Sequence, residues 1–472
     1  MSYTRIGRGI ALAAAIGIAG TVHAQTSATR PPQKYEALAR EILGELVAIN
    51  TTAANGTTAA AKAVAARALA AGFPAADVQV LAPPDHPEKG NVVVRLRGRS
   101  SERPVLYICH LDVVEARRED WTFDPFKLTE QDGWLYGRGT IDMKGQVSAV
   151  LTSLIRMKQE GVVPNRDIIA AFAADEETGD NNGVAWLLEK HRPLVDAALV
   201  INHDGGEAAI KQGRKVYLGV QTSEKMYLTF SLETTDKGGH SSRPTAENPI
   251  YRLAAGLERL GKFRFPVHLT DTTRLYFTRR ADLETGQVQS DMRAILKSPA
   301  DPAALERLSS TVETNIQLRT TCTTTMIEGG HAENALPQRA RATVQCRVIP
   351  GESRESVAAA IGAAVADPKI AVSFVTPDAP PAPDSPPTPD ILAKVESITR
   401  AMFPGVIVLP QMSAGATDSI YTRGAGIPSY GIDAMFDDLD DGRAHGRDER
   451  INVTVFAEEI EFAYRLMRAV SS

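Results

Sequence analysis

Residues 105–112 have the sequence VLYICHLD, an apolar run that ends in a histidine and an aspartate. Two later segments have the same form: 168–177 is IIAAFAADEE and 198–204 is ALVINHD. Short apolar runs of this kind are typical of strands that are buried on both faces. Because ligands bind at the carboxyl ends of the strands in open α/β sheets, we expect the polar residues after these three runs to meet in one crevice.

Helical and strand patterns alternate around these runs. Helices are expected at 35–49, 58–71, 143–159 and 183–191, and strands at 78–81, 91–96, 105–109, 167–173 and 197–201. Such alternation predicts an α/β domain with a mostly parallel sheet that helices cover on both faces. Residues 36–221 are expected to form its first part.

The pattern changes after Gly219. Strands at 225–234, 320–327, 339–349 and 370–375, with helices at 249–260 and 355–365, give the order βαββαβ. This order predicts a smaller ferredoxin-like domain, a lid, at 222–378. Residues 261–311 are an insertion within it that we expect to be helical.

The proline-dense run 377–389 predicts a stiff connector that returns the chain to the first domain. Residues 379–472 are expected to complete that domain with helices at 391–402 and 453–470 and a strand at 406–409. A chain of 472 residues is too long for one compact core, which agrees with more than one unit. The net charge of -5 and the lack of a long basic run argue against a nucleic-acid-binding protein.

The N-terminus has the features of an export signal. Arg5 and Arg8 precede the apolar run 10–19, and small residues at 22–24 suit cleavage after Ala24. An uncleaved membrane anchor is the alternative, but the run is shorter than the roughly 20 residues that a span requires. We therefore expect a signal peptide at 1–24 and a periplasmic or secreted mature chain without membrane partners.

The three cysteines cannot all pair within one chain. Cys109 and Cys346 lie in expected strands, which favours buried thiols over a disulfide framework. A Cys322–Cys346 bridge stays open as an alternative, because an oxidising compartment would permit it. There is no Cys-x-x-Cys pair, so a zinc ribbon is excluded.

Imidazole and carboxylate side chains around the predicted crevice are candidate metal ligands. They are His110, Asp142, Glu177, Asp204 and His445. One zinc ion takes about three protein ligands and an open position, so five ligands with one bridging carboxylate fit two zinc ions about 3.5–4 Å apart. Asp142 is the expected bridge, because the glycine-rich loop 137–145 can approach both ions. The same ligands accept cobalt or manganese.

Two further acids have expected roles beside the metals. A metal-bound histidine usually donates its other ring N–H to a carboxylate or carbonyl, so Asp112 is expected to orient His110, either with its side chain or through the local backbone. Of the neighbours Glu176 and Glu177, one would bind metal and the other would take a proton from water, although spacing does not say which. Each feature alone is common on protein surfaces. Their coincidence at several strand ends favours a working site, because unpaired buried charges are costly.

Together these motifs resemble those of the two-zinc metallopeptidases and amidohydrolases related to carboxypeptidase G, aminoacylase-1 and succinyl-diaminopimelate desuccinylase. The matching stretches are HLDVV at 110–114, GRGTIDMKG at 137–145, ADEETG at 174–179, NHDGG at 202–206, GGHSSRP at 238–244, ENALP at 333–337 and HGRDE at 445–449. The resemblance implies that Asp142 is shared between two zinc sites. One would be completed by His110 and Asp204, and the other by Glu177 and His445.

The resemblance also assigns Glu176 as general base, with Asp112 as the orienting carboxylate. In the lid, His240 and Asn334 match residues that reach the reacting carbonyl, often from a partner subunit, which makes His240 a candidate oxyanion donor. Arg347 matches a lid arginine that pairs with a substrate carboxylate. The alternatives are a turn histidine at 240 and a surface ion pair at 347. Lids of this family often dimerise, so a homodimer is expected.

The segment 413–418, SAGATD, resembles the family's glycine-threonine-aspartate substrate loop, which makes Gly415 and Thr417 substrate-binding candidates. We expect it to open a helix whose N-terminus favours an anion such as a carboxylate. Alanines at 414 and 416 depart from the usual glycines and leave the pocket shape open.

The resemblance implies an exported metal-dependent hydrolase of peptide bonds, of the carboxypeptidase or dipeptidase type. The alternative is an N-acyl-amino-acid amidohydrolase that uses the same site. A non-catalytic binding protein of this fold would be expected to lack ligands or the base, and all of these are present.

Overall fold

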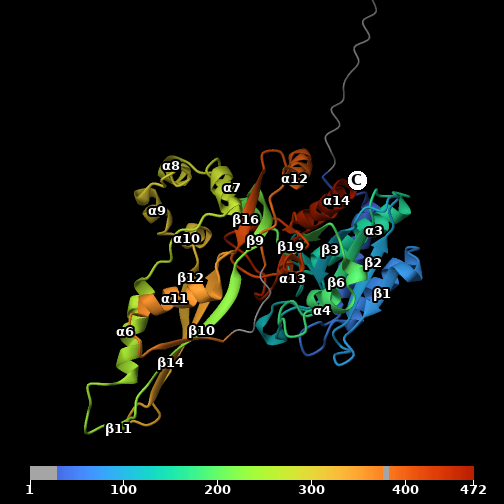
Figure 1. Cartoon of the computed structure of the whole chain (residues 1–472). Coiled ribbons are helices and arrows are strands. Elements are labelled where there is room, and N and C mark those ends of the chain that lie inside the picture. Colours follow the sequence, from blue (N-terminus) through green and yellow to red (C-terminus); the bar gives the residue numbers. More distant parts are fainter. Residues whose placement is uncertain (1–28, 376–381) are drawn as a thin grey trace, which may run out of the picture.

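The computed structural model describes residues 29–375 and 382–472. It contains a main domain built on a ten-stranded sheet and a lid built on a four-stranded sheet (Figure 1). The predicted signal peptide, 1–24, lies outside the described residues, as do residues 377–381 of the predicted connector. In the described part of the chain, no helix combines the length and the apolar character that a membrane span requires.

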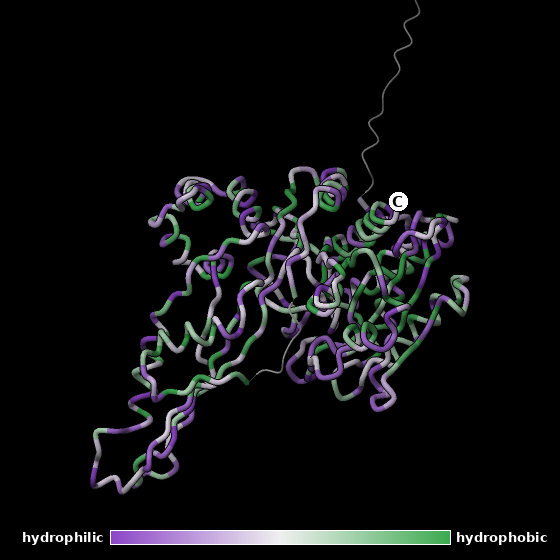
Figure 2. Tube along the Cα trace, in the orientation of Figure 1, coloured by the Kyte–Doolittle hydropathy of each residue, from purple (hydrophilic) through white to green (hydrophobic). Residues whose placement is uncertain are grey.

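Three parallel strands form the centre of the main sheet: β3 (Val105–His110), β6 (Ile168–Ala173) and β7 (Leu199–Asn202). All residues of β3 and β6 are buried. Their alternate side chains enter two cores, one beneath α1 (Gln33–Ala48), α3 (Lys144–Gln159) and α14 (Val453–Val470), the other beneath α4 (Gly183–Lys190) and α5 (Arg192–Val195). The expected two-faced α/β sheet is therefore confirmed, and Figure 2 shows how strongly hydrophobic this region is.

The sheet is parallel at its centre and mixed toward its edges. Its other strands are β1 (Val78–Leu81), β2 (Asn91–Leu96), β8 (Ala208–Lys211), β9 (Arg214–Glu224), β16 (Ile407–Ser413), β17 (Ser429–Gly431) and β18 (Asp437–Asp438). Helices α2 (Thr58–Ala70), α12 (Pro389–Met402) and α13 (Ser419–Gly424) complete the domain, with a small separate sheet of β4 (Thr129–Gln131), β5 (Trp134–Tyr136) and β19 (Arg450–Asn452).

The lid has the predicted βαββαβ order. Its antiparallel sheet runs β12 (Thr321–Gly329), β14 (Arg339–Val348), β10 (Met226–Thr235) and β15 (Ala371–Phe374), packed against α6 (Pro249–Lys262) and α11 (Arg354–Val365). The short pair β11 (Gly239–His240) and β13 (Ala335–Leu336) forms its distal tip. Strand β9 pairs with β16 as far as Glu224, so the chain enters the lid at Lys225, slightly after the expected start at 222.

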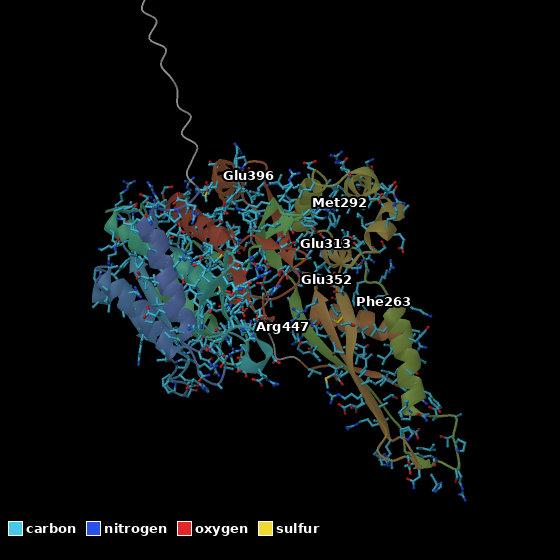
Figure 3. All side chains as sticks on the ribbon, turned by 180° about the vertical axis from the view of Figure 1, so that it is seen from behind. Phe263, Met292, Glu313, Glu352, Glu396 and Arg447 are labelled. Atoms are coloured by element: carbon cyan, nitrogen blue, oxygen red, sulfur yellow. A yellow bond between two sulfur atoms is a disulfide. The ribbon has the colours of Figure 1, made fainter. Side chains whose placement is uncertain are left out.

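The insertion at 261–311 is helical, as expected, and contains α7 (Asp271–Arg280), α8 (Gly286–Ala294) and α9 (Pro302–Leu308). A fourth helix, α10 (Val312–Leu318), follows it directly. These helices share a core with Tyr217 of β9 and Leu409 of β16. An ion pair joins Arg279 to Glu396 of α12, and Glu396 lies on the same side of the molecule as Met292 and Glu313 of the insertion (Figure 3). By its packing, the insertion therefore belongs to the main domain.

Cys322 and Cys346 form a disulfide, while Cys109 is a free buried thiol. The two bonded cysteines are register partners on β12 and β14, with Cα atoms 4.1 Å apart. The preference for unpaired thiols is therefore wrong for this pair, because strand pairing brings together residues whose separation in sequence says nothing about their contact.

Candidate metal centre and active site

Asp142 lies between two histidines that come from distant parts of the chain. Its Oδ1 is 3.0 Å from Nε2 of His110, at the end of β3, and its Oδ2 is 3.0 Å from Nε2 of His445. The same His445 nitrogen is 3.0 Å from Oε2 of Glu177. This arrangement gives Asp142 the position that a ligand shared by two metal ions requires.

Ligand atoms of four acidic side chains gather around His110. In one group, atoms of His110, Asp142 and Glu177 lie within 4.8 Å of one another. In a second group, atoms of His110, Glu176 and Asp204 do so. Two overlapping groups of nitrogen and carboxylate oxygen donors fit two zinc-type cations better than one.

The electrostatics of this cluster also fit cations. Burial, followed by the neighbouring Asp204, raises the pKa of Glu176 to about 10. Burial likewise raises the pKa of Asp204 to about 7, although His110 opposes the shift. Hydrogen bonds to Asp142 and Glu177 raise the pKa of His445 to about 10. Carboxylates packed this closely repel one another, and bound cations would relieve that repulsion.

Asp112 acts on its surroundings in two ways. Its backbone carbonyl accepts a hydrogen bond of 3.0 Å from Nδ1 of His110, which leaves Nε2 facing Asp142. Its carboxylate accepts the backbone N–H groups of Glu176 (3.2 Å) and Glu177 (3.0 Å). The hydrogen bond that orients His110 is therefore made by the Asp112 backbone, and Oδ1 of Asp112 lies 3.7 Å from the same ring nitrogen. The carboxylate also positions the two glutamates.

The turn that carries the glutamates is held by Asp175, whose role the sequence did not indicate. Asp175 has a positive φ of 65°, and its carboxylate accepts hydrogen bonds from Thr178 Oγ1 (2.6 Å) and the Asn181 N–H (2.7 Å). Lys89 pairs with the same carboxylate. The first acid of the ADEETG motif was the available signal, since aspartate tolerates this backbone conformation.

Glu449, the last residue of the HGRDE motif, is a second residue that supports the site and for which the sequence predicted no role. Its buried Oε1 accepts the N–H groups of Ile141 (2.8 Å) and Asp142 (3.1 Å), and its Oε2 pairs with Arg138 at 2.6 Å. Arg138 also donates to the carbonyl of Gly446, next to His445. Glu449 thus ties the Asp142 loop to the His445 loop. Arg447 of this motif lies on the side of the main domain that faces the lid (Figure 3).

The candidate substrate loop is followed by a helix, but the expected anion site is not formed there. Helix α13 has only six residues, and buried Asp418 occupies its N-cap. The N–H and hydroxyl of Thr417 both donate to Oε2 of Glu224. A carboxylate of the protein itself therefore uses the donors of Thr417, while Gly415 is exposed.

The lid candidates do not join this cluster within one chain. His240 and Asn334 are exposed and lie close together at the lid tip, on or beside the paired strands β11 and β13. Figure 1 shows this tip well away from the ends of β3 and β6. Arg347 of β14 is half-buried and lies 4.7 Å from the ring centre of Tyr227. Among the described residues, no carboxylate pairs with Arg347.

Comparisons with known proteins agree with this geometry. The chain is 29% identical over 385 residues to a probable carboxypeptidase S-like 2 of Dictyostelium discoideum, covering 78% of this chain and 72% of the relative. It is 28% identical over 380 residues to the human N-fatty-acyl-amino acid synthase/hydrolase PM20D1, covering 78% and 74%. The fold is similar to that of an M20 family metallo-carboxypeptidase from Sulfolobus solfataricus, with a TM-score of 0.65, 17% identity, and 91% and 98% of the two chains covered.

The model of peptidase family M20/M25/M40 matches residues 106–469, which include all five candidate metal ligands and all but one residue each of β3 and the C-terminal helix. This confirms the resemblance stated from the motifs. The chain therefore belongs to the M20/M25/M40 peptidase family and is an enzyme that hydrolyses amide bonds.

Proposed function

We propose that the protein is an exported two-zinc peptidase of the carboxypeptidase or dipeptidase type, with Glu176 as general base. The observation that carries this proposal is the convergence of His110, Asp142 and His445 with Glu177 on one bridging position. His110, Asp142 and Asp204 would hold one ion, and Asp142, Glu177 and His445 the other. When bound, the pair of ions would acidify a water molecule and polarise the substrate carbonyl.

The protein's own residues would handle the proton. Glu176 has a carboxylate oxygen grouped with ligand atoms of His110 and Asp204, so it lies beside the place where a water molecule would be activated. It would accept the proton of that water and deliver it to the leaving nitrogen. Asp112 supports this role, because it holds the backbone N–H groups of both glutamates.

Arg347 supports a substrate that carries a free carboxylate. Its guanidinium is half-buried, and Tyr227 rather than an acid lies against it. A planar guanidinium pairs well with a carboxylate through two parallel hydrogen bonds. Peptides with a free C-terminus and N-acyl amino acids both offer such a group.

The second candidate function is therefore hydrolysis of N-acyl amino acids at the same site. The relative named an N-fatty-acyl-amino acid synthase/hydrolase favours it, because the alignment covers 74% of that protein at 28% identity. The relative named a carboxypeptidase is as similar, so the two candidates must be separated by experiment.

A homodimer would explain why the lid tip is remote from the site of its own chain. Strand β12 is at the edge of the described lid sheet, and it exposes Met326 (60%) and Ile327 (62%). Tyr251 of α6 is 74% exposed. An unprotected edge strand with apolar side chains is a template for pairing with another strand. We propose that two copies pair through β12, so that His240 and Asn334 serve the partner's site.

The experiment is an activity screen on protein that starts at Gln25, stripped with a chelator and reloaded with zinc, cobalt or manganese. The panel contains dipeptides, carboxyl-blocked dipeptides, and N-acetyl, N-succinyl and N-fatty-acyl amino acids. We expect metal-dependent cleavage of substrates with a free carboxylate and none of the blocked ones. Activity that survives metal removal would reject the proposal. Secretion of the full chain, with a new N-terminus at Gln25, tests the proposed export.

A further inference from the structure

Glu224, the last residue of β9, is a buried acid that faces the candidate substrate loop. Glu224 is only 1% exposed. Oε2 accepts the N–H of Thr417 at 2.8 Å and the hydroxyl of Thr417 at 3.1 Å, while Oε1 accepts Nη1 of Arg423 at 2.8 Å. The carboxylate of Glu224 therefore joins the end of β9, just before the lid, to both the substrate loop and α13.

Arg423 extends this connection to the chain that returns from the lid. Its Nε donates to Oγ of Ser385 at 3.1 Å, and its Nη2 donates to the carbonyl of Ser429 at 2.9 Å. The N–H of Ser385 in turn donates to the carbonyl of Thr222 on β9. The outgoing and returning segments are thus held together by one guanidinium and its partners.

Lys225, the first residue past β9, adds two more contacts at the same place. Its N–H donates to the carbonyl of Ser413, at the start of the substrate loop. Its buried ammonium donates to the carbonyl of Arg319 at 2.7 Å, where the chain passes from α10 into β12. Three crossings between the main domain and the lid therefore lie around Glu224 and Lys225, and these two residues bond to the substrate loop.

Stability alone does not require this arrangement. A buried ion pair is often no more stabilising than apolar side chains of similar size, because both charges must leave water. The pair instead holds the Glu224 carboxylate in one orientation, in which Oε2 accepts both the N–H and the hydroxyl of Thr417. Buried, satisfied polar networks specify one arrangement of the segments that they join.

We propose that Glu224 and Arg423 are positioning residues that couple the conformation of loop 413–418 to the orientation of the lid. A change in lid orientation would then move the substrate loop with it. The inference rests on the proposed function only in taking this loop as part of the substrate site.

The test uses the full mature chain and a double variant, Glu224→Met with Arg423→Met, which removes both charges at similar volume. Spin labels at Lys190→Cys in α4 and Lys262→Cys in α6 report the distance between the domains, and amide hydrogen exchange reports the loop. We expect a thermal midpoint near that of the parent protein. We also expect exchange in 413–418 at least about tenfold faster, as for the loss of a hydrogen bond to a charged group, and a broader label distance.

A milder pair of variants covers the case in which the double variant does not fold. Thr417→Val removes the hydroxyl that donates to Glu224, whereas Thr417→Ser keeps it. We expect faster loop exchange and a broader distance distribution in Thr417→Val only. Parent-like exchange and distances in the folded double variant, or in Thr417→Val, would overturn the inference. Neither readout needs turnover, so failure of the proposed function would be recognised separately by an inactive parent protein.

Discussion

Glu176 and Glu177 are neighbours in sequence but have different surroundings. Glu177 contacts the imidazole of His445, so it lies among the candidate metal ligands. The side chain of Glu176 lies with His110 and Asp204, and its pKa is raised to about 10, first by burial and then by Asp204. The backbone N–H groups of both residues donate to the carboxylate of Asp112, which holds the backbone of this turn in place. The spacing in the sequence could not assign these two roles.

Replacing Glu176 tests its role as base. We expect Glu176→Gln to lower kcat by about 10²- to 10⁴-fold, the usual contribution of a general base, while the bound metal per chain is unchanged. Steady-state kinetics and elemental analysis measure the two quantities. Glu189→Gln, on the exposed end of α4, is the matched control. Activity of Glu176→Gln close to that of the control would remove Glu176 from the mechanism.

Metal binding is expected to release protons. The pKa of His445, raised to about 10 by Asp142 and Glu177, keeps this imidazole protonated near neutral pH in the metal-free chain. A metal ion binds the neutral imidazole. The metal affinity should therefore fall as the pH is lowered, by up to about tenfold per pH unit for each proton that the metal displaces. Calorimetry in buffers of different ionisation enthalpy measures the protons released. A release of zero near neutral pH would contradict this assignment.

The same shift fixes the sign of one contribution to stability. The folded pKa of His445 lies above its unfolded value, so its pairs with Asp142 and Glu177 stabilise the metal-free chain at low pH. That contribution is complete below about pH 6.5, the ordinary histidine pKa, and is lost as the pH rises through about 10.

At the scale of elements, the two loops that carry Asp142 and His445 depend on each other. Glu449 accepts the N–H of Asp142, and its partner Arg138 donates beside His445. We expect Glu449→Gln to weaken metal affinity by about 10- to 100-fold, because residues behind metal ligands usually contribute that much. Competition with a chromogenic chelator measures the affinity. Asp440→Asn, an exposed acid in the same segment, should bind like the parent.

The disulfide is expected to hold the edge strand of the lid. It joins β12 to β14 across a sequence separation of 24 residues. Chain-entropy estimates for a loop of this size give about 3 kcal/mol, so Cys322→Ser with Cys346→Ser should lower the free energy of lid unfolding by about that amount. Denaturant unfolding followed by hydrogen exchange in β12 checks this, with the reduced parent protein as a comparison. Unchanged exchange in β12 would show that strand pairing alone suffices.

At the scale of the whole molecule, the remote lid tip makes subunit mixing informative. If His240 serves the partner's site, a chain with His240→Ala and a chain with Glu176→Gln are each inactive alone. Their mixed dimer contains one complete site, so a statistical mixture should recover about one quarter of the parent activity. Activity that does not rise on mixing would reject a shared site.

The interface has its own control. Met326→Glu with Ile327→Glu places charges on the proposed edge of β12 and should yield monomers by light scattering. Leu439→Glu, at an exposed apolar residue of the main domain, should leave the assembly unchanged. A dimer that survives both charges on β12 would place the interface elsewhere.

The alternation of strands and helices, the βαββαβ order of the lid and the polar residues at the ends of β3, β6 and β7 were all predictable from local sequence pattern. These follow from local causes. Hydrophobic periodicity decides which face of an element is buried, and the carboxyl ends of neighbouring parallel strands must share one edge. His110, Glu177 and Asp204 could therefore be placed together without coordinates.

The partners that those residues contact could be seen only once the distant elements were packed together. The carboxylate of Asp112 accepts the backbone N–H groups of the glutamate turn as well as lying 3.7 Å from the His110 ring. Glu449 holds Asp142 from 307 positions away, and the donors of Thr417 are taken by Glu224. The inserted helices pack on β9 and β16, and His240 stands at the far tip of the lid. Periodicity states that a side chain is buried, but its partner depends on how distant elements pack, and that information is absent from any local pattern.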